Sequence, residues 1–263
     1  MQHAELKQLM GDVQGIAEAA GQEIMAIFRD ESRWALEHKA DDSPLTAADL
    51  AAHRLILARL TDLTPDIPVI SEESEAIPRD VRAQWSRCWM VDPLDGTKEF
   101  ISKNGEFTVN IALVEHGEPV AGVVYAPALK RIFWGEKGVG AAHGKVDGDV
   151  VSAWHPLAVR KLPAEGATVV ASRSHRDQAT EDFLKTVKVK SLCSAGSSLK
   201  FCLIAAAEAD LYPRFGRTME WDTAAGHAVL LAAGGKVVTV EGPVLSYGKR
   251  ARGYDNPGFI ASA

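Results

Sequence analysis

Apolar residues recur at steps of three or four along the N-terminal part of the chain. This spacing predicts an amphipathic helix whose apolar face carries Leu6, Leu9, Val13, Ile16, Ala20, Ile24 and Ile27. A second helix is expected to begin near Thr46, because Thr46-Ala-Ala-Asp49 resembles a capping box with Asp in place of Glu. It ends at Thr64-Pro65-Asp66, where turn-forming residues break the pattern.

The middle of the chain changes to short β-prone runs separated by turn signals. The predicted strands are Ile67–Ile70, Cys88–Val91, Phe107–Val114, Val120–Tyr125 and Ile132–Trp134. Because long helices do not separate them, we expect an antiparallel sheet packed on the first two helices.

Strands and helices alternate after about residue 150. The predicted strands are Val169–Ala171, Val189–Leu192, Ala209–Tyr212, Lys236–Val240 and Phe259–Ala261, and the helices span 176–186, 198–207 and 222–233. Such alternation favours an α/β unit with a mixed, largely parallel sheet. The polar, glycine-rich stretch Gly138–Val159 is the predicted boundary, which divides the chain into residues 1–150 and 151–263.

The composition is that of a globular protein of 263 residues with a net charge of −6. This acidic balance argues against binding to nucleic acid or to an anionic membrane surface, because both need a positive footprint. Cys88, Cys193 and Cys202 have no paired short spacing, so we expect neither a disulfide framework nor a zinc site, and a reducing cytosol. No apolar run approaches the roughly 18 residues of a membrane span, and the N-terminus lacks a signal-peptide profile.

The segment from Val91 to Phe100 carries the most informative chemistry. Asp92 and Asp95 lie three residues apart across a turn fixed by Pro93, so their carboxylates and the Leu94 carbonyl can face one cation. Mg²⁺ prefers such oxygen ligands. Gly96 has no Cβ, and the N–H groups of Gly96 and Thr97 would face a phosphate at a helix start. The same residue types also form ordinary turns and helix caps.

Further acids flank this segment, and each has a plainer structural explanation. Glu72 and Glu73 follow a predicted strand and are typical of a solvated loop. Asp222 opens a small-residue helix, where the helix dipole alone favours an acid. Asp49 is explained by the capping box.

Taken together, the motifs resemble the lithium-sensitive, Mg²⁺-dependent phosphatase superfamily that includes inositol monophosphatase. They are Glu72-Glu73, Asp92-Pro93-Leu94-Asp95-Gly96-Thr97 and Trp221-Asp222, in that order. A resemblance to the bacterial 3′(2′),5′-bisphosphate nucleotidases of the CysQ type covers nearly the whole chain, through Lys98-Glu99-Phe100, 104–110, 172–175, 196–202 and 211–216. Ser74 departs from the pattern, since many nucleotidases carry another acid there. The resemblance implies an αβαβα layered sandwich of the α+β / α/β type, with an antiparallel N-terminal sheet.

The resemblance also implies the roles of individual residues. Two or three Mg²⁺ ions, with Li⁺ as an inhibitor, would be held by Glu72, Asp92, Asp95, Asp222 and the carbonyl of Leu94. Thr97, hydrogen-bonded to Asp49, would orient the attacking water and help accept its proton, and Glu72 would take part in the same activation. The substrate would contact Glu72, Leu94, Asp95, Gly96, Thr97, His175, Ser197, Lys200, Arg214 and Asp222. Residues 1–150 would then form the metal-binding, catalytic domain and 151–263 the nucleotide-binding domain.

The implied reaction removes the 3′-phosphate of adenosine 3′,5′-bisphosphate (PAP), a by-product of sulfate assimilation, to give AMP and phosphate. The sulfated form, 3′-phosphoadenylyl sulfate, is a second substrate candidate. One alternative keeps the metal chemistry and acts on inositol monophosphate or a sugar bisphosphate. Another is a non-catalytic metal- or nucleotide-binding protein, which the complete acid set disfavours. The partner is thus a small nucleotide, and we expect a cytoplasmic protein, free or peripheral on the cytoplasmic face of the inner membrane.

Overall fold

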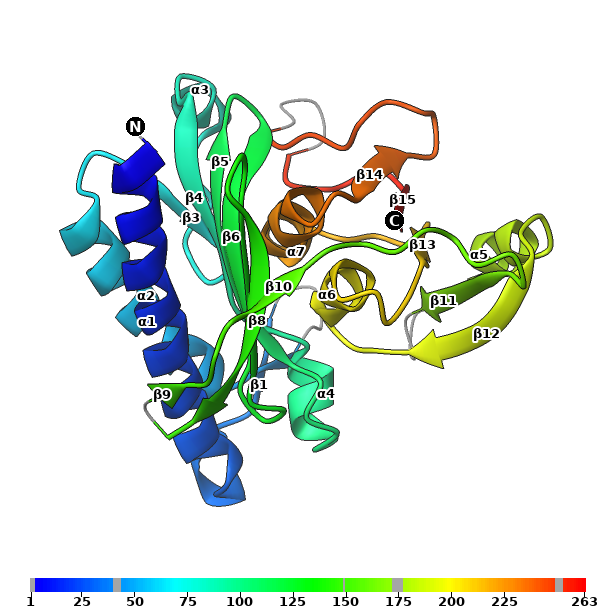
Figure 1. Cartoon of the computed structure of the whole chain (residues 1–263). Coiled ribbons are helices and arrows are strands. Elements are labelled where there is room, and N and C mark those ends of the chain that lie inside the picture. The colour runs from blue at the N-terminus through cyan, green and yellow to red at the C-terminus, as the bar shows by residue number, and fades with distance from the viewer. Residues whose placement is uncertain (1–2, 40–43, 149, 172–176, 249–252) are drawn as a thin grey trace.

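The computed structural model describes residues 3–39, 44–148, 150–171, 177–248 and 253–263. Figure 1 shows two sheets with helices between them and outside them. The helices are α1 (His3–Phe28), α2 (Ala47–Leu63), α3 (Arg79–Arg82), α4 (Thr97–Ile101), α5 (Gln178–Leu184), α6 (Leu199–Ala205) and α7 (Glu220–Ala232), with a 3₁₀ turn at Glu31–Arg33. The strands are β1 (Glu37–His38), β2 (Pro44–Leu45), β3 (Val69–Ser71), β4 (Arg87–Asp95), β5 (Thr108–Glu115), β6 (Glu118–Ala126), β7 (Arg131–Glu136), β8 (Gly140–Asp147), β9 (Val150–Val151), β10 (His155–Leu157), β11 (Ala167–Ala171), β12 (Val189–Ser194), β13 (Leu211–Arg214), β14 (Lys236–Thr239) and β15 (Phe259–Ser262).

The first sheet has the strand order β10-β8-β7-β6-β5-β4-β3, with β9 paired to β8. Its pairings are antiparallel as predicted, except that β3 runs parallel to β4 at one edge. Alternate residues of β5 face opposite layers: Ile111 and Leu113 pack with the core on α1 and α2, while Ala112 packs with the core on α6 and α7. Both faces of the sheet are therefore covered by helices.

Helix α7 lies against the first sheet at unusually close range, because glycines of the sheet face it. A Cβ on Gly122 would fall 2.7 Å from the carbonyl oxygen of Ala225, and one on Gly135 would fall 2.6 Å from Cα of Val229. Only glycine allows backbones to approach this closely. The start of α7, which carries Asp222, is thereby held near the end of β4.

The second sheet has the order β12-β11-β13-β15-β14. The pairings of β11 with β12 and β13 are parallel, whereas those of β15 with β13 and β14 are antiparallel. The sheet is mixed as predicted, but the expectation of a largely parallel sheet was too strong, because β15 returns between β13 and β14. The layers run α1/α2, first sheet, α6/α7, second sheet and α5, which confirms the αβαβα sandwich (Figure 1).

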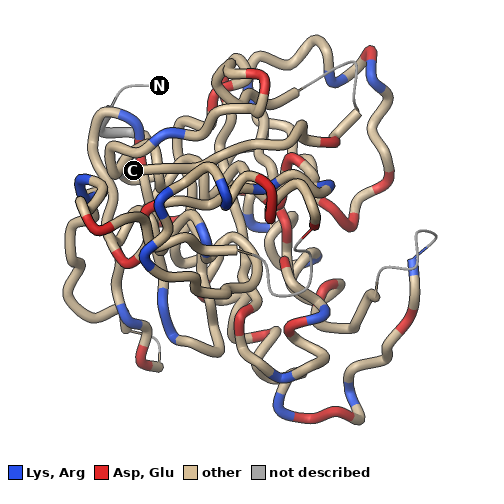
Figure 2. Tube along the Cα trace, turned by 90° about the vertical axis from the view of Figure 1, so that its right-hand side faces the viewer, with Lys and Arg blue, Asp and Glu red and all other residues tan. Residues whose placement is uncertain are grey.

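The stretch Gly138–Val159 forms strands β8 to β10. Strand β10 pairs with β8 through residues His155 to Leu157, so the first sheet extends past residue 150. The division of the chain into residues 1–150 and 151–263 remains a prediction. Among the described residues no helix is long and apolar enough to cross a membrane. Acidic and basic residues are interspersed along the described trace (Figure 2).

Candidate active site

Three carboxylates from separate segments meet at the end of the first sheet. Glu72 directly follows β3, Asp92 lies in β4, and Asp222 lies in the first turn of α7. The parallel register that pairs Ser71 with Val91 brings Glu72 beside Asp92. Carboxylate oxygens of Glu72, Asp92 and Asp222 lie within 4.8 Å of one another, which makes these three the group in the described part of the chain best able to hold a metal ion.

The electrostatics of this cluster favour a bound cation. Burial, and then the negative charges of Glu72, Asp95 and Asp222, raise the pKa of Asp92 well above its usual value. Burial, followed by Asp95 and Glu72, does the same to the pKa of Asp222. Carboxylates held this close repel each other unless a proton or a cation lies between them. An all-oxygen donor set of this kind fits Mg²⁺.

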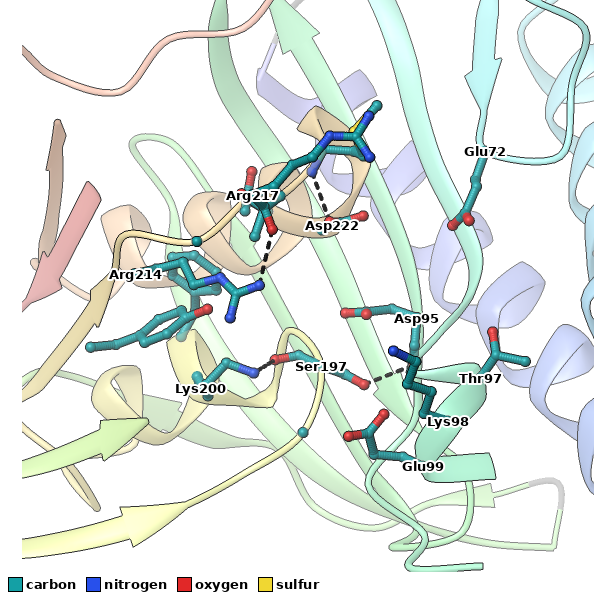
Figure 3. A pocket seen from close by; sticks show the side chains of 18 of the residues that line it. Glu72, Asp95, Thr97, Lys98, Glu99, Ser197, Lys200, Arg214, Arg217 and Asp222 are labelled. Carbon is teal, nitrogen blue, oxygen red and sulfur yellow. Dashed lines mark hydrogen bonds between the residues drawn. The ribbon is translucent and has the colours of Figure 1, made fainter. Parts of the chain in front are cut away.

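Asp95 is anchored differently from the other acids. Its Oδ2 atom accepts hydrogen bonds from the backbone N–H of Ser198 at 2.8 Å and from Nδ2 of Asn110 at 3.2 Å. Burial raises the pKa of Asp95 to about 6, although Lys200 and the Asn110 hydrogen bond oppose this rise. Asp95 lines the same pocket as Glu72 and Asp222, and the three side chains face a common space (Figure 3).

Where a turn was predicted between Asp92 and Asp95, strand β4 continues with a shift in its register against β5, and Gly96 then leads into α4. Oδ1 of Asp92 accepts a hydrogen bond from the N–H of Leu94 at 3.1 Å. Gly96 has a φ of +91°, and a Cβ there would fall 2.3 Å from Oγ of Ser197. Because Gly96 has no side chain, it makes room for Ser197. This reason for a glycine at position 96 was not apparent from the sequence.

Asp49 both caps helix α2 and contacts Thr97, the two roles that the sequence analysis considered for it. Its Oδ2 atom accepts hydrogen bonds from the N–H and Oγ1 of Thr46 at 2.8 and 2.6 Å, which completes the predicted capping box. Its Oδ1 atom accepts one from Oγ1 of Thr97 at 3.2 Å. Burial raises the pKa of Asp49 against the effect of the Thr46 hydrogen bonds. The cap and the site thus share one carboxylate.

The segment before α6 connects the second half of the chain to the acids. Oγ of Ser197 donates to the carbonyl oxygens of Asp95 and Glu106 at 2.7 and 2.8 Å. Oγ of Ser198 donates to the carbonyl oxygen of Asp222 at 2.5 Å and accepts from Asn110 at 3.1 Å. Asn110 is fully buried and was not predicted as a site residue, although it lies in a run that carried the family resemblance.

The acids open onto a pocket of about 600 Å³. Its lining includes the predicted substrate residues Glu72, Asp95, Gly96, Thr97, Ser197, Lys200, Arg214 and Asp222, together with Lys98, Glu99, Asp177 and Arg217. Figure 3 shows Lys200 and Arg214 across the pocket from Glu72 and Thr97. The side chain of Leu94 is buried, and His175 lies outside the described residues.

The two predicted cations differ in their surroundings. Nζ of Lys200 is buried and donates to the carbonyl oxygens of Ser197 and Ala195 at 2.6 and 3.3 Å. Burial lowers its pKa to about 8, against the attraction of Asp95. Arg214 is half-buried, and its Nη2 donates to the carbonyl oxygen of Arg217 at 2.9 Å. Lys200 thus supports the Ser197 backbone directly.

Lys39 is a site residue that sequence reasoning missed. Its Nζ lies 2.7 Å from Oε1 of Glu72 and 2.6 Å from Oε1 of Glu73. Although burial alone would lower the pKa of Lys39, these two ion pairs raise it. Nothing in the sequence near Lys39 signals this contact, because its partners lie 33 and 34 residues further along the chain.

Comparison with known proteins agrees with this geometry. The model of the inositol monophosphatase family matches residues 6–263. The 3′(2′),5′-bisphosphate nucleotidase CysQ of Salmonella typhimurium is 50% identical over 93% of this chain and 95% of its own, and that of Escherichia coli K12 is 47% identical over 97% and 99%. The crystal structure of CysQ from Bacteroides thetaiotaomicron superposes with a TM-score of 0.82 at 39% identity, covering 96% of both chains. The chain therefore belongs to the inositol monophosphatase family.

Proposed function

We propose that the protein is a Mg²⁺-dependent phosphomonoesterase that removes the 3′-phosphate of PAP to give AMP and phosphate. The observation that carries this proposal is one pocket with an acidic wall, formed by Glu72, Asp95 and Asp222, and a cationic wall that includes Arg214. A doubly phosphorylated nucleotide needs both. The CysQ nucleotidases, which are 47–50% identical over nearly the whole chain, support the same reaction class.

The acids would hold the metal. Glu72, Asp92 and Asp222 supply clustered oxygens, and Asp95 and the Leu94 carbonyl would complete the sites for two or three ions. When bound, Mg²⁺ supplies charge neutralisation for the transferred phosphoryl group and lowers the pKa of a water molecule. Li⁺ is the proposed inhibitor, because it would occupy a site without matching the charge.

Thr97 and Asp49 would orient the attacking water. The Thr97 hydroxyl donates its proton to Asp49, so its oxygen remains available to accept a hydrogen bond from a water molecule in the pocket. Thr46 holds Asp49 in place through two hydrogen bonds. The half-buried Glu72 would accept the proton that the water loses.

The opposite wall would bind the phosphate that is not cleaved. Arg214 suits this role because its planar guanidinium can bind two phosphate oxygens. Lys200 would contribute a positive charge from beneath the Ser197 turn, which its ammonium already supports. This wall favours a bisphosphate over inositol monophosphate, which has no second phosphate to place there. A sugar bisphosphate and 3′-phosphoadenylyl sulfate remain substrates to compare. The three free cysteines are consistent with the proposed location in the cytoplasm.

Phosphate release tests the proposal directly. The protein, first freed of metal with EDTA, is supplied with Mg²⁺ and assayed on PAP, inositol 1-phosphate and fructose 1,6-bisphosphate. We expect kcat/KM to be highest on PAP and activity to vanish again with EDTA. R214Q should raise KM for PAP at least tenfold with a smaller change for inositol 1-phosphate, whereas R59Q on the outer face of α2 serves as the control. Faster hydrolysis of inositol 1-phosphate than of PAP would contradict the substrate assignment.

A further inference from the structure

A second cavity, of about 450 Å³, lies at the opposite end of β4 from the acids. Arg87, Cys88 and Met90 at the start of β4 line it, whereas Asp92 and Asp95 lie toward the end of the same strand. The rest of the described lining comes from α3 and the loop after it, from Ile70 of β3 and Val114 of β5, from the β5–β6 turn, and from Tyr247 and Gly248. No described residue lines both this cavity and the active-site pocket.

The charged side chains that line this cavity, among the described residues, are all arginines. They are Arg79, Arg82 and Arg87. Arg87 forms an ion pair with Glu115. Arg82 donates through Nε to the carbonyl oxygen of Ile77 at 3.2 Å, and its guanidinium lies 4.1 Å from the centre of the Tyr254 ring. These contacts leave the Nη groups of Arg82, and the exposed side chain of Arg79, without a hydrogen bond to any described residue.

The nearby acids offset this positive charge in part, but no described acid forms an ion pair with Arg79 or Arg82. Glu115 is already paired with Arg87. Glu220 is fully buried, where it accepts a hydrogen bond from the N–H of Gly248 at 2.8 Å. Gly248 lines the cavity and Glu220 does not, so this hydrogen bond places Glu220 behind the lining. Burial, and then the charge of Glu220, raise the pKa of Cys88 to about 12. Two of the three arginines at this cavity, Arg79 and Arg82, thus carry a charge that no ion pair with a described residue neutralises.

Apolar and aromatic groups complete the lining. Trp85 is half-buried and packs against the core beside Met90 and Val114. Tyr247 is held by hydrogen bonds of its hydroxyl with Nδ1 of His227 at 2.9 Å and Oγ1 of Thr223 at 3.2 Å, so the position of its ring is fixed. Arginines beside an indole ring recognise a ligand that combines an anion with a flat group.

We propose that this cavity is a binding site, separate from the active site, for a small organic anion: a phosphate or sulfate ester with an aromatic group. Arg79 and Arg82 would bind the anionic group, and Trp85 would contact the flat one. The volume of the cavity lies in the range of small-molecule sites, about 300–1,000 Å³. The proposal does not depend on the reaction at the other end of β4.

Hydrogen exchange localises binding to either site, and AMP is the probe, with uncharged adenosine beside it. AMP should slow amide exchange in residues 79–90 and 114–117 of the wild-type protein and of R214Q, which is altered only in the active-site pocket. The AMP concentration for half-maximal protection of these segments should rise at least tenfold in R79Q/R82Q. R79E should show the same rise, and since the side chain of Arg79 is exposed and makes no hydrogen bond to a described residue, this variant keeps the test independent of folding.

The proposal is overturned if AMP leaves exchange in both segments unchanged at concentrations that protect the active-site pocket. It is also overturned if R79E and R79Q/R82Q are protected at the wild-type concentration of AMP. Equal protection by adenosine would show that the arginines do not bind the ligand, and would refute the anionic class.

Discussion

Replacing Gly96 by alanine tests whether the residue after Asp95 must lack a side chain so that Ser197 can hydrogen-bond to the backbone of Asp95. Gly96 has a φ of +91°, and an added Cβ would lie 2.3 Å from Oγ of Ser197. Gly138, in the turn between β7 and β8, has a φ of +79° and nothing within 4 Å of an added Cβ. G138A therefore carries the backbone strain alone and is a matched control for G96A.

The two variants should differ by the hydrogen bonds of Ser197. A left-handed conformation costs a residue with a Cβ about 1–2 kcal/mol, which both variants incur. In G96A the Ser197 hydroxyl must also turn away from the carbonyl oxygens of Asp95 and Glu106. The hydroxyl has one proton, shared between these two acceptors, so its loss adds about 1 kcal/mol. We expect the free energy of unfolding to fall by about 2–3 kcal/mol in G96A and by about 1–2 kcal/mol in G138A.

Urea unfolding of metal-free protein measures the stability, and phosphate release from PAP measures the activity. Because the backbone of Asp95 would move with Ser197, kcat/KM should fall roughly a hundredfold in G96A, the effect expected of a misplacement near 1 Å, and stay near wild type in G138A. If G96A matched G138A in both stability and activity, the close approach between Gly96 and Ser197 would have no importance for the site.

Three further changes test other parts of the molecule. D95N should nearly abolish phosphate release and weaken Mg²⁺ binding in calorimetry while the circular dichroism spectrum stays native, and unchanged kinetics would contradict the assignment. Millimolar Li⁺ should inhibit phosphate release in the presence of Mg²⁺, and full activity would remove Li⁺ as a proposed inhibitor. Asp210 has a pKa below its usual value, chiefly because of its hydrogen bonds with Arg160. The ionised carboxylate therefore stabilises the folded protein fully above about pH 4, and this stabilisation is lost as pH falls through the lowered pKa. D210N should thus lower the free energy of unfolding by about 2 kcal/mol at pH 7, with a smaller loss at pH 3, and an equal loss at both pH values would contradict this mechanism.

The parts of the site that lie close together in the sequence could be predicted from it. The capping box of Thr46 and Asp49 depends on neighbouring residues and forms as expected. The segment from Asp92 to Asp95, which was predicted as a turn, is instead the irregular end of strand β4. The contact between Asp49 and Thr97 spans 48 residues and was inferred from the family resemblance. The first helix followed from its apolar spacing, because α1 buries one continuous face.

Contacts that only the folded chain creates escaped prediction. Asn110 joins Asp95 and Ser198 from inside a strand, where its neighbours in the sequence gave no reason to assign it a role. Strand β8 is rich in alanine and glycine, which have low β propensity, and it forms because β7 and β10 pair with both of its edges. The second sheet was expected to be largely parallel because strands and helices alternate, but none of the described residues between β14 and β15 is helical, and these two strands pair antiparallel.

The net charge of the chain also says little about the charge at its site, and the structure gives the reason. Glu72 and Glu73 share the ammonium of Lys39, and Asp95 lies within electrostatic reach of the buried Lys200. Lysines thus offset part of the negative charge from two sides of the pocket. The main charges that act on the pKa of Asp92 are all negative. Among those that act on the pKa of Asp222, Arg214 is the one cation, and its effect is the weakest. Because the charge left uncompensated is concentrated on these two aspartates, beside Glu72, a divalent cation is drawn to this cluster rather than to the other acids of the pocket.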